Sequence, residues 1–356
     1  MSDPRKAPVS GPAHTFVIAE AGVNHNGDEA LALRLVEVAA RSGADAVKFQ
    51  TFSADRLVRP GAEKAEYQKR ATGEGDQHAM LRALEMSEAM HRRLFERCGE
   101  LGIEFMSTPF DEQAADFLVS IGMRRIKVPS GEITNHPFLA YLAAKGLPMI
   151  LSTGMSTLDE IREAVDAIAA ARARAGFAEP LERVLTILHC TSNYPAACAD
   201  ANLRAMATIA DATDLPVGYS DHTGGLAVST AAVALGATVI EKHFTLDRSL
   251  PGPDHRASLE PDELAALVRQ VRDVVAALGS PIKAPVASEL PVRELVRRSV
   301  TTVRAVAKGR ALERADLALL RPGNGIAPRE LDRVVGCRAA RDLPAGTTLH
   351  WQDLLQ

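Results

Sequence analysis

Ionisable side chains recur in this chain at the ends of short apolar runs. Two of them are lysines, Lys48 and Lys127, and two are histidines, His222 and His243. Side chains of these types serve enzymes as acids, bases, nucleophiles and ligands of anions or metals. A protein without catalytic activity could place scattered polar groups at such positions to solvate a rim. The number gathered here exceeds what solvation requires, and the pattern therefore indicates an enzyme.

The two histidines are candidate metal ligands. His222 and His243 end consecutive apolar runs, so their imidazoles could converge on one ion if those runs lie side by side. Imidazole, carboxylate and water together suit a divalent ion such as Mn²⁺, Zn²⁺ or Fe²⁺, and Glu20 is the nearest carboxylate by topology. The lack of nearby thiolates argues against a closed structural zinc site. Two rim histidines bonded to backbone carbonyls are the alternative.

The lysines and a group of hydroxyls are candidate anion ligands. Two ammonium groups and three hydroxyls at one mouth are what a small substrate with a phosphate and a carboxylate requires. Backbone N–H groups at Gly131 and Gly154 could also approach such an anion closely. A lysine at the end of a strand could instead form a Schiff base, so an aldolase mechanism stays open. The five side chains are those of Lys48, Thr108, Lys127, Ser130 and Ser152.

Repeated strand and helix units must position these side chains. From residue 16 to about residue 278, short β-branched runs alternate with longer segments of helical period, such as 28–41, 158–173 and 261–278. Eight such units predict a (β/α)8 TIM barrel, in which catalytic groups lie where strands end. A doubly wound open sheet is the alternative, but no GxGxxG turn follows the first run. The predicted strands are 16–20, 46–49, 103–107, 125–128, 149–152, 184–189, 216–219 and 238–243.

The helical period is lost between residues 279 and 298, where Pro281, Pro285 and Pro291 occur. We therefore predict a TIM-barrel catalytic domain over residues 1–285, a linker over 286–297 and a small, mainly β domain over 298–356. A domain of roughly 60 residues is marginal alone. We expect it to gain burial by packing on a barrel, either its own or that of a partner subunit.

Composition excludes several classes of protein. Hydrophobic residues make up 46% and charged residues 24% of the chain, which excludes a disordered or fibrous protein. The 41 basic and 45 acidic residues form no basic stripe, so no nucleic-acid partner is expected. No apolar run is long enough to span a membrane, and residues 1–12 are polar and proline-rich, so we expect a cytoplasmic protein. The four cysteines include no CxxC pair and are expected to be reduced.

A series of motifs resembles the sialic acid synthase family. The motifs follow one another in order through nearly the whole predicted barrel, and RPGNGI from Arg321 resembles that family's C-terminal antifreeze-like, or SAF, domain. They are IAEAGVNHNG from Ile18, GADAVKFQTF from Gly43, MSTPFD from Met106, IKVPSGEITN from Ile126, ILSTGM from Ile150, HCTSNYP from His189, GYSDHTGG from Gly218, EKHFTLD from Glu241 and GPDH from Gly252.

The resemblance implies a reaction and an assembly. Members condense phosphoenolpyruvate with an N-acetylated mannosamine-type sugar, giving a nine-carbon 2-keto-3-deoxy acid such as N-acetylneuraminate and releasing phosphate. They are homodimers that depend on a divalent metal, Mn²⁺ or Mg²⁺. The small domain of one chain caps the barrel of the other, which makes the dimer domain-swapped.

The resemblance also implies roles for individual residues. His222 and His243 would bind the metal, and Glu20 or Glu132 would take a proton from the attacking water. Phosphoenolpyruvate would be bound by Lys48, Thr108, Lys127, Ser130 and Ser152, and the sugar or an intermediate by Glu20, Glu132, Tyr194, Ser220 and Asp254, with Gln50 beside them and Arg321 from the partner's cap.

The chain departs from the family pattern at one of these positions. The family's asparagine in the HCTxxYP segment is shifted here, because this chain has Ser192 followed by Asn193. Which of the two residues takes the polar role stays open.

The sequence leaves two sugar substrates open. Our first expectation is N-acetylmannosamine, giving N-acetylneuraminate. The alternative is 2,4-diacetamido-2,4,6-trideoxymannose, giving N,N'-diacetyllegionaminate, because the Ala-Glu-Tyr-Gln element from Ala65 to Gln68 resembles that branch of the family. Tyr67 in this element could equally serve surface packing.

Two rival classes stay open. One is a metal-independent Schiff-base aldolase that uses Lys127 or Lys242 and pyruvate. The other is a carbohydrate- or ice-binding protein built on the C-terminal segment, although that segment covers only about a sixth of the chain.

Overall fold

The computed structural model describes residues 14–355, which form two compact units. The first unit ends at Gly279 and the second begins at Ser280, whereas the sequence placed this boundary after residue 285. Gly279 ends a long helix with a φ of +47°, a conformation that favours glycine. Residues 1–12, on which the expectation of a cytoplasmic protein partly rests, lie outside the described residues. None of the described helices is long and apolar enough to cross a membrane.

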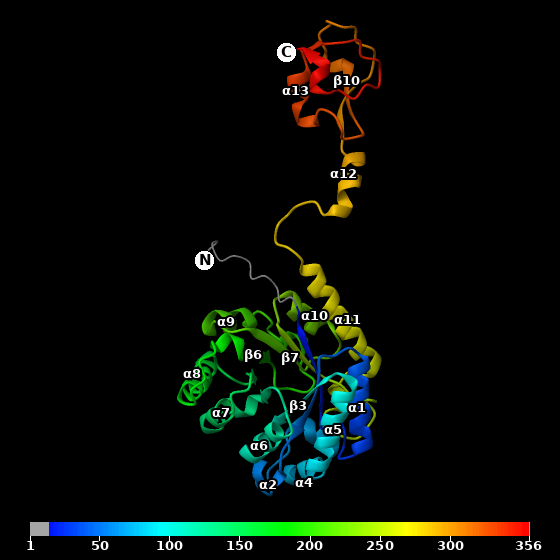
Figure 1. Ribbon diagram of the computed structural model, residues 1–356. Helices are drawn as coiled ribbons and strands as arrows, with labels where there is room; N and C mark the ends of the chain where they lie inside the picture. Colours follow the sequence, from blue (N-terminus) through cyan, green and yellow to red (C-terminus); the bar gives the residue numbers. More distant parts are fainter. Residues whose placement is uncertain (1–13, 356) are drawn as a thin grey trace. The chain divides into compact units, whose positions relative to one another are not determined.

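The first unit is built around eight parallel strands in the order β3-β2-β1-β8-β7-β6-β5-β4. Figure 1 shows some of them, among them β3, β6 and β7. Each neighbouring pair in this order is parallel, and β3 and β4 at its two ends also approach each other. The predicted TIM barrel is therefore confirmed. Every predicted strand is present: β1 (Phe16–Gly22), β2 (Ala46–Thr51), β3 (Glu104–Pro109), β4 (Ile126–Val128), β5 (Met149–Ser152), β6 (Leu185–Cys190), β7 (Val217–Asp221) and β8 (Val239–His243).

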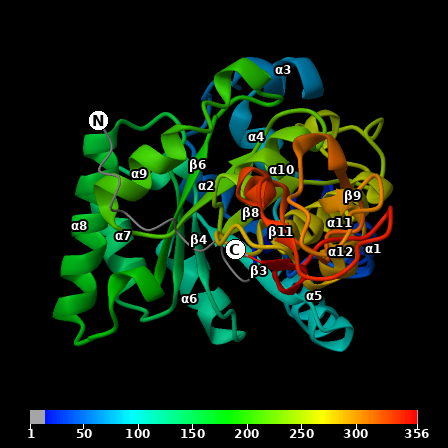
Figure 2. The ribbon, with the colours of Figure 1, turned by 90° about the horizontal axis from the view of Figure 1, so that it is seen from above.

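Helices surround the strands (Figure 2). Local sequence fixes their ends: the side chain of Asp28 accepts a hydrogen bond from the backbone of Leu31 before α1, and Thr157 and Glu160 form a capping box at α8. Gly102 ends α5 with a φ of +70°. The helices of the repeated units are α1 (Glu29–Arg41), α5 (Glu88–Leu101), α6 (Glu112–Ser120), α7 (His136–Ala143), α8 (Leu158–Arg174), α9 (Ala205–Thr213), α10 (Ala227–Ala234) and α11 (Pro261–Leu278).

Strand alternation divides the core into two layers. One face of the strands packs against the helices and forms the larger apolar core. The other face points into the barrel, where six side chains from six strands form a separate apolar cluster. Because side chains on a strand alternate with a period of two, the inward residue two positions further along each strand lies above this floor. The floor consists of Ile18, Ala46, Met106, Ile150, Leu188 and Val239.

The connection from β2 to α5 is longer than a simple turn. It contains the short helices α2 (Ala54–Leu57), α3 (Glu66–Thr72) and α4 (Gln77–Arg82). We call the segment from Phe52 to Ser87 the β2–α5 excursion. Long connections of this kind in compact domains are commonly functional.

The second unit is mainly β, as predicted. β9 (Ser299–Thr302) pairs antiparallel with β10 (Leu317–Leu320), and β11 (Arg338–Ala339) pairs with β12 (Leu354–Leu355). A helix, α13 (Leu331–Val334), packs its Val334 into the core of this unit.

The predicted linker, residues 286–297, contains a helix, α12 (Leu290–Val296). The sequence suggested instead that regular structure is lost here, because the segment contains Pro291. Pro291 lies in the first turn of α12, where a backbone N–H would have no partner within the helix and proline is therefore tolerated.

The barrel floor gives a prediction about stability. Leu188 is fully buried in the floor, so Leu188→Ala should lower the free energy of unfolding by about 2–5 kcal/mol through lost burial and a cavity. Urea denaturation followed by circular dichroism measures this change. Leu235→Ala is the control, because Leu235 is 59% exposed, and it should have little effect. Equal midpoints for both variants would contradict the described floor.

Candidate active site

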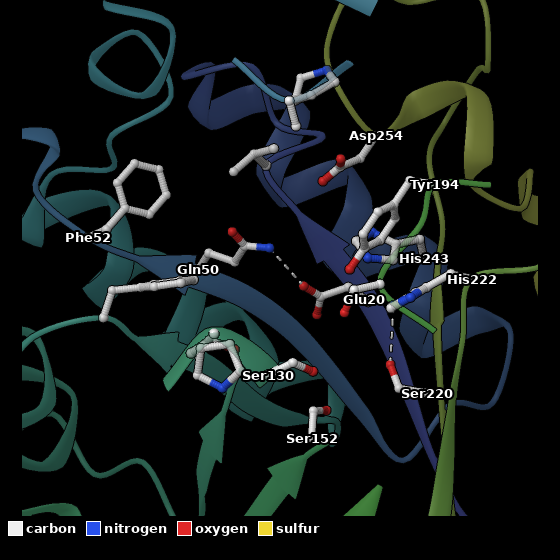
Figure 3. Close-up of a pocket in the computed structure, with 18 of the residues that line it drawn as sticks. Glu20, Gln50, Phe52, Ser130, Ser152, Tyr194, Ser220, His222, His243 and Asp254 are labelled. Carbon is white, nitrogen blue, oxygen red and sulfur yellow. Dashed lines mark hydrogen bonds between the residues drawn. The ribbon is translucent and has the colours of Figure 1, made fainter. Parts of the chain in front are cut away.

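A cavity of about 550 Å³ opens at the carboxyl ends of the barrel strands. Figure 3 shows side chains from different strands and loops that converge on it, among them Glu20, Ser152 and His243. Among the residues that the sequence proposed for the site, those that line the cavity are Glu20, Lys48, Gln50, Thr108, Lys127, Ser130, Glu132, Ser152, Ser192, Tyr194, Ser220, His222, His243 and Asp254.

Two lysines and two carboxylates form a buried charge network directly above the barrel floor. The Nζ atom of Lys48 lies 2.5 Å from Oε2 of Glu20 and 3.6 Å from Oε2 of Glu241. The Nζ atom of Lys127 lies 3.4 Å from Oε1 of Glu241. All four side chains are at most 6% exposed. Formal charge is therefore balanced within the network, as burial requires.

The two carboxylates of the network differ in acidity. Burial raises the pKa of Glu20 to about 7. Attraction by Lys48 lowers this pKa, and repulsion by Glu241 offsets part of that lowering. Burial would also raise the pKa of Glu241, but attraction by Lys127 and Lys48 and a hydrogen bond from Ser220 lower it to about 2. Glu20 is therefore the member of the network that can take up a proton near neutral pH.

The two lysines differ as well. Burial opposes the charge of both, but Glu20 and Glu241 together raise the pKa of Lys48. At Lys127 burial prevails, and its pKa is lowered. Lys48 is thus a fixed positive charge that faces both carboxylates, whereas Lys127 forms an ion pair with Glu241 alone.

Glu241 is a site residue that the sequence analysis did not select. Its Oε1 accepts a hydrogen bond of 2.8 Å from Oγ of Ser220 and faces Lys127. The signal was present in the alternation of β8, because Glu241 and His243 are two positions apart and therefore point to the same side of the strand. Lys242 lies between them and points the other way.

Hydroxyl groups surround the lysines. Thr108 Oγ1 accepts a hydrogen bond of 3.1 Å from Lys48, and Ser130 Oγ accepts one of 2.9 Å from the backbone N–H of Gly154. Ser152 Oγ is buried without a hydrogen-bond partner among the described residues. A buried hydroxyl in this state is a ready ligand for an incoming polar group.

Gly154 allows the loops around these hydroxyls to meet. A Cβ atom at this position would lie 2.2 Å from Oγ of Ser192 and 3.0 Å from Oγ of Ser130. The first distance is too short for a Cβ atom and the second is tighter than most such contacts, so a larger residue would force the serine side chains to shift. The backbone N–H of Gly154 donates to Ser130, and its approach to an anion stays a prediction.

His222 and His243 lie next to each other at the same end of the cavity, with ring centroids 5.7 Å apart (Figure 3). The ring of Tyr194 packs on both, at 4.2 Å from His222 and 5.5 Å from His243. Nδ1 of His222 lies 2.6 Å from the carbonyl oxygen of Thr191 and must donate to it. The alternative in which rim histidines bond to backbone carbonyls thus explains only Nδ1 of His222. Nε2 of His222 carries no proton and can accept a hydrogen bond or bind a metal.

The imidazole pair fits a divalent metal. Nδ1 of His243 is buried and has no hydrogen-bond partner within the described chain. Burial lowers the pKa of both histidines, and that of His243 falls further through repulsion by His222 and Lys48. Both rings are therefore neutral, the form that binds a metal. Nε2 of His222 lies 3.4 Å from Oγ of Ser220, but that hydroxyl donates its proton to Glu241 at 2.8 Å. Among residues 14–355, no third histidine, cysteine or carboxylate completes the set, so substrate or water oxygens would supply the other ligands.

Three further polar side chains line the upper part of the cavity. Asp254 is buried, and burial raises its pKa to about 6. Gln50 donates a hydrogen bond of 3.3 Å to Oε1 of Glu20 (Figure 3). Glu132 is only half-buried, and its carboxylate accepts a hydrogen bond of 2.7 Å from Asn135. Glu20 therefore lies deeper in the cavity than Glu132.

Three residues that the sequence analysis named for the site do not line the cavity. Asn193 is exposed and accepts a hydrogen bond from the backbone of Tyr194, while Ser192 lines the cavity, so the shifted motif presents the serine. Arg321 is an exposed residue of the second unit. Lys242 pairs with Asp221 at 2.9 Å and donates to the carbonyl of Thr223.

This placement of Lys242 counts against one form of the aldolase hypothesis. A Schiff-base lysine must reach the substrate, but Lys242 does not line the cavity. It is one of two lysines named for that mechanism, and only Lys127 faces the cavity.

The chain is similar to proteins of one family throughout its length. The model of the NeuB family matches residues 35–283, and that of the SAF domain matches residues 297–355. An N,N'-diacetyllegionaminic acid synthase of Legionella pneumophila is 56% identical over 95% of this chain and 94% of its own length. The enzyme of the same name from Campylobacter jejuni is 44% identical over 92% of this chain and 96% of its own.

A solved structure is similar as well. It is that of an N-acetylneuraminic acid (sialic acid) synthetase from Leptospira borgpetersenii in complex with citrate. It is 35% identical, with a TM-score of 0.67, and the match covers 78% of this chain and 90% of that one.

The charge network gives a prediction about Glu241. Glu241→Gln should lower the free energy of unfolding by about 3 kcal/mol, because it leaves buried lysine charge without a partner. Differential scanning calorimetry measures the change. Asp159→Asn is the matched control, since Asp159 is 86% exposed in its pair with Arg162, and it should leave stability unchanged. A Glu241→Gln variant as stable as this control would show that the network is not held by opposite charges.

Asp254 gives a prediction about pH. Its pKa in the folded protein lies above the ordinary value of 3.8, so folding favours the protonated form. Its contribution is fully present below about pH 4 and is lost as the pH rises through about 6. Over this range the natural protein should lose about 3 kcal/mol relative to Asp254→Asn. Urea titrations of both proteins across pH 4–7 measure the difference, and a constant difference would contradict the buried position.

Proposed function

Because this chain belongs to the NeuB family and carries an SAF domain, we propose that it condenses phosphoenolpyruvate with an open-chain N-acetylated amino sugar and releases phosphate. Family membership confirms the resemblance seen in the sequence motifs. The observation that carries the proposal is one cavity that combines an anion-binding end at Lys48 and Lys127 with a pair of neutral imidazoles at His222 and His243.

The lysine end would bind the carboxylate and phosphate of phosphoenolpyruvate. Lys127 forms an ion pair with Glu241 alone, and the hydroxyls of Thr108, Ser130 and Ser152 provide polar ligands around it. Anions bound by lysine and hydroxyl groups in a buried site are held strongly because water does not screen them. The lysines need not become nucleophiles, which separates this proposal from the Schiff-base aldolase.

Glu20 would accept a proton from the attacking water. The two lysines face the two carboxylates Glu20 and Glu241, so a bound dianion would make the site more negative and would favour this proton uptake during the reaction. Glu20 can take up a proton near neutral pH, because burial raises its pKa to about 7. We therefore assign to Glu20, rather than to the shallower Glu132, the removal of a proton from the water that attacks the condensed intermediate.

His222 and His243 would hold a divalent metal, Mn²⁺ or Mg²⁺. Such an ion, when bound, polarises an aldehyde oxygen and makes its carbon electrophilic. Tyr194 packs on both rings and fixes their orientation. Asp254 and Gln50 would orient the hydroxyl groups of the sugar. A domain-swapped dimer, with Arg321 supplied by the partner, belongs to the same proposal.

The sugar that we propose is 2,4-diacetamido-2,4,6-trideoxymannose, which would give N,N'-diacetyllegionaminate. The relatives named N,N'-diacetyllegionaminic acid synthases are 56% and 44% identical to this chain, and the sialic acid synthetase of solved structure is 35% identical. These similarities support the alternative reading of the sequence better than our first expectation of N-acetylmannosamine.

The test is release of phosphate from phosphoenolpyruvate in the presence of each sugar, with and without EDTA. We expect release with 2,4-diacetamido-2,4,6-trideoxymannose, weaker release with N-acetylmannosamine, and loss of both in EDTA with recovery on adding Mn²⁺. His222→Ala should abolish release without loss of structure, whereas the control His14→Ala, at an exposed residue paired with Asp45, should retain it. Turnover in metal-free buffer would refute the metal, and preference for N-acetylmannosamine would refute the assigned sugar.

A further inference from the structure

The cavity has a second side that is apolar. Phe52 lies across the cavity from His222 and His243 (Figure 3). It belongs to a cluster of apolar side chains that pack on one another and line this side. We call this surface the apolar wall; it consists of Val23, Phe52, Met80, Leu81, Leu84 and Phe110.

The side chains of the apolar wall pack on one another. Most of it comes from the β2–α5 excursion, in which α4 supplies Met80 and Leu81. The rings of Phe52 and Phe110 meet edge to face at 5.9 Å. Polar contacts behind the wall hold the excursion in place.

One of these contacts joins the backbone of Ala54 to Glu85 at 2.6 Å. A second group joins Asp55 of α2 to His78 and Arg82 of α4. Both lie within the excursion and connect α2 to α4 and to the residues just after α4, where Leu84 of the wall lies.

The six side chains of the wall carry no N–H, O–H or oxygen that could pair with a hydroxyl group. Gln68 and Gln77 also line the cavity, and Nε2 of Gln77 donates to Oε1 of Gln68 at 3.3 Å, so these two amides are partly paired with each other. The same oxygen of Gln68 accepts from the backbone of Ala65 at 3.0 Å. A hydroxyl placed against the wall would lose water while meeting mainly carbon, which is unfavourable.

The proposed positions of phosphoenolpyruvate and of the imidazole pair determine which part of the sugar lies against the apolar wall. The aldehyde carbon C1 must lie near phosphoenolpyruvate and the imidazole pair, and the acetamido group on C2 lies next to it. The far end of the open chain, C5 and C6, therefore extends toward the opposite side. We propose that the apolar wall receives C6 of the sugar and selects a methyl group over a hydroxymethyl group there. This inference rests on the proposed function and assigns the selectivity to named residues.

Two sugars that differ in one atom test the inference. They are 2,4-diacetamido-2,4,6-trideoxymannose and 2,4-diacetamido-2,4-dideoxymannose, which carries a hydroxyl on C6 and keeps both acetamido groups. Phosphate release should show a kcat/KM roughly 10–100-fold higher for the 6-deoxy sugar, the range that apolar pockets reach against an added hydroxyl. Equal values for the two sugars would overturn the inference while leaving the proposed function intact. No release with either sugar would overturn both.

A matched pair of variants locates the selectivity. Met80→Gln places an amide in the wall, and Met86→Gln makes the same change at a half-buried residue that packs against the larger core and does not line the cavity. Met80→Gln should reduce the ratio of kcat/KM values at least several-fold, mainly by raising KM for the 6-deoxy sugar, and Met86→Gln should leave the ratio unchanged. Met80→Leu should retain the natural ratio.

Circular dichroism of each variant confirms that it is folded. Equal changes of the ratio in Met80→Gln and Met86→Gln, or no change in Met80→Gln, would show that the wall does not select at C6. The comparison of sugars with the natural protein stands independently of these variants.

Discussion

Opposite charges must be kept together inside a barrel from which water is largely excluded, and the rest of the site depends on that constraint. A buried lysine or carboxylate is tolerated only with a partner. The parallel register supplies the partners, because Glu20 lies opposite Lys48 on one neighbouring strand and opposite His243 on the other. The sheet that holds the fold together thus also sets the spacing of the charges.

The strands and most of the polar cavity could be predicted from the sequence, since both follow from local patterns. Apolar runs gave the strands, and polar residues at their ends gave the positions of Lys48, Lys127, His222 and His243. Glu241 was missed because strand alternation was not applied within β8, and it is alternation that separates Glu241 from Lys242.

Other features depend on contacts that no local pattern encodes. The apolar wall assembles from three segments far apart in the sequence, represented by Val23, Met80 and Phe110. Three of its residues are buried and three are half-buried, and no single helix or strand carries more than two of them, so they share no common period. Ser192 and Asn193 are adjacent, and only the path of the loop decides which of them faces the cavity. The helix α12 was missed for a different reason, because proline breaks helices in their middle but not in their first turn.

The excursion between β2 and α5 is braced largely by its own contacts, such as those of Asp55 and of Glu85, and it contributes no member of the buried charge network. Substitutions in this segment can therefore change the lining of the cavity without removing a member of that network. Within such an architecture, descendants of one ancestral enzyme can diverge in the sugar that they accept while inheriting the same chemistry. The segment is accordingly a natural unit to graft between relatives in order to exchange their substrates.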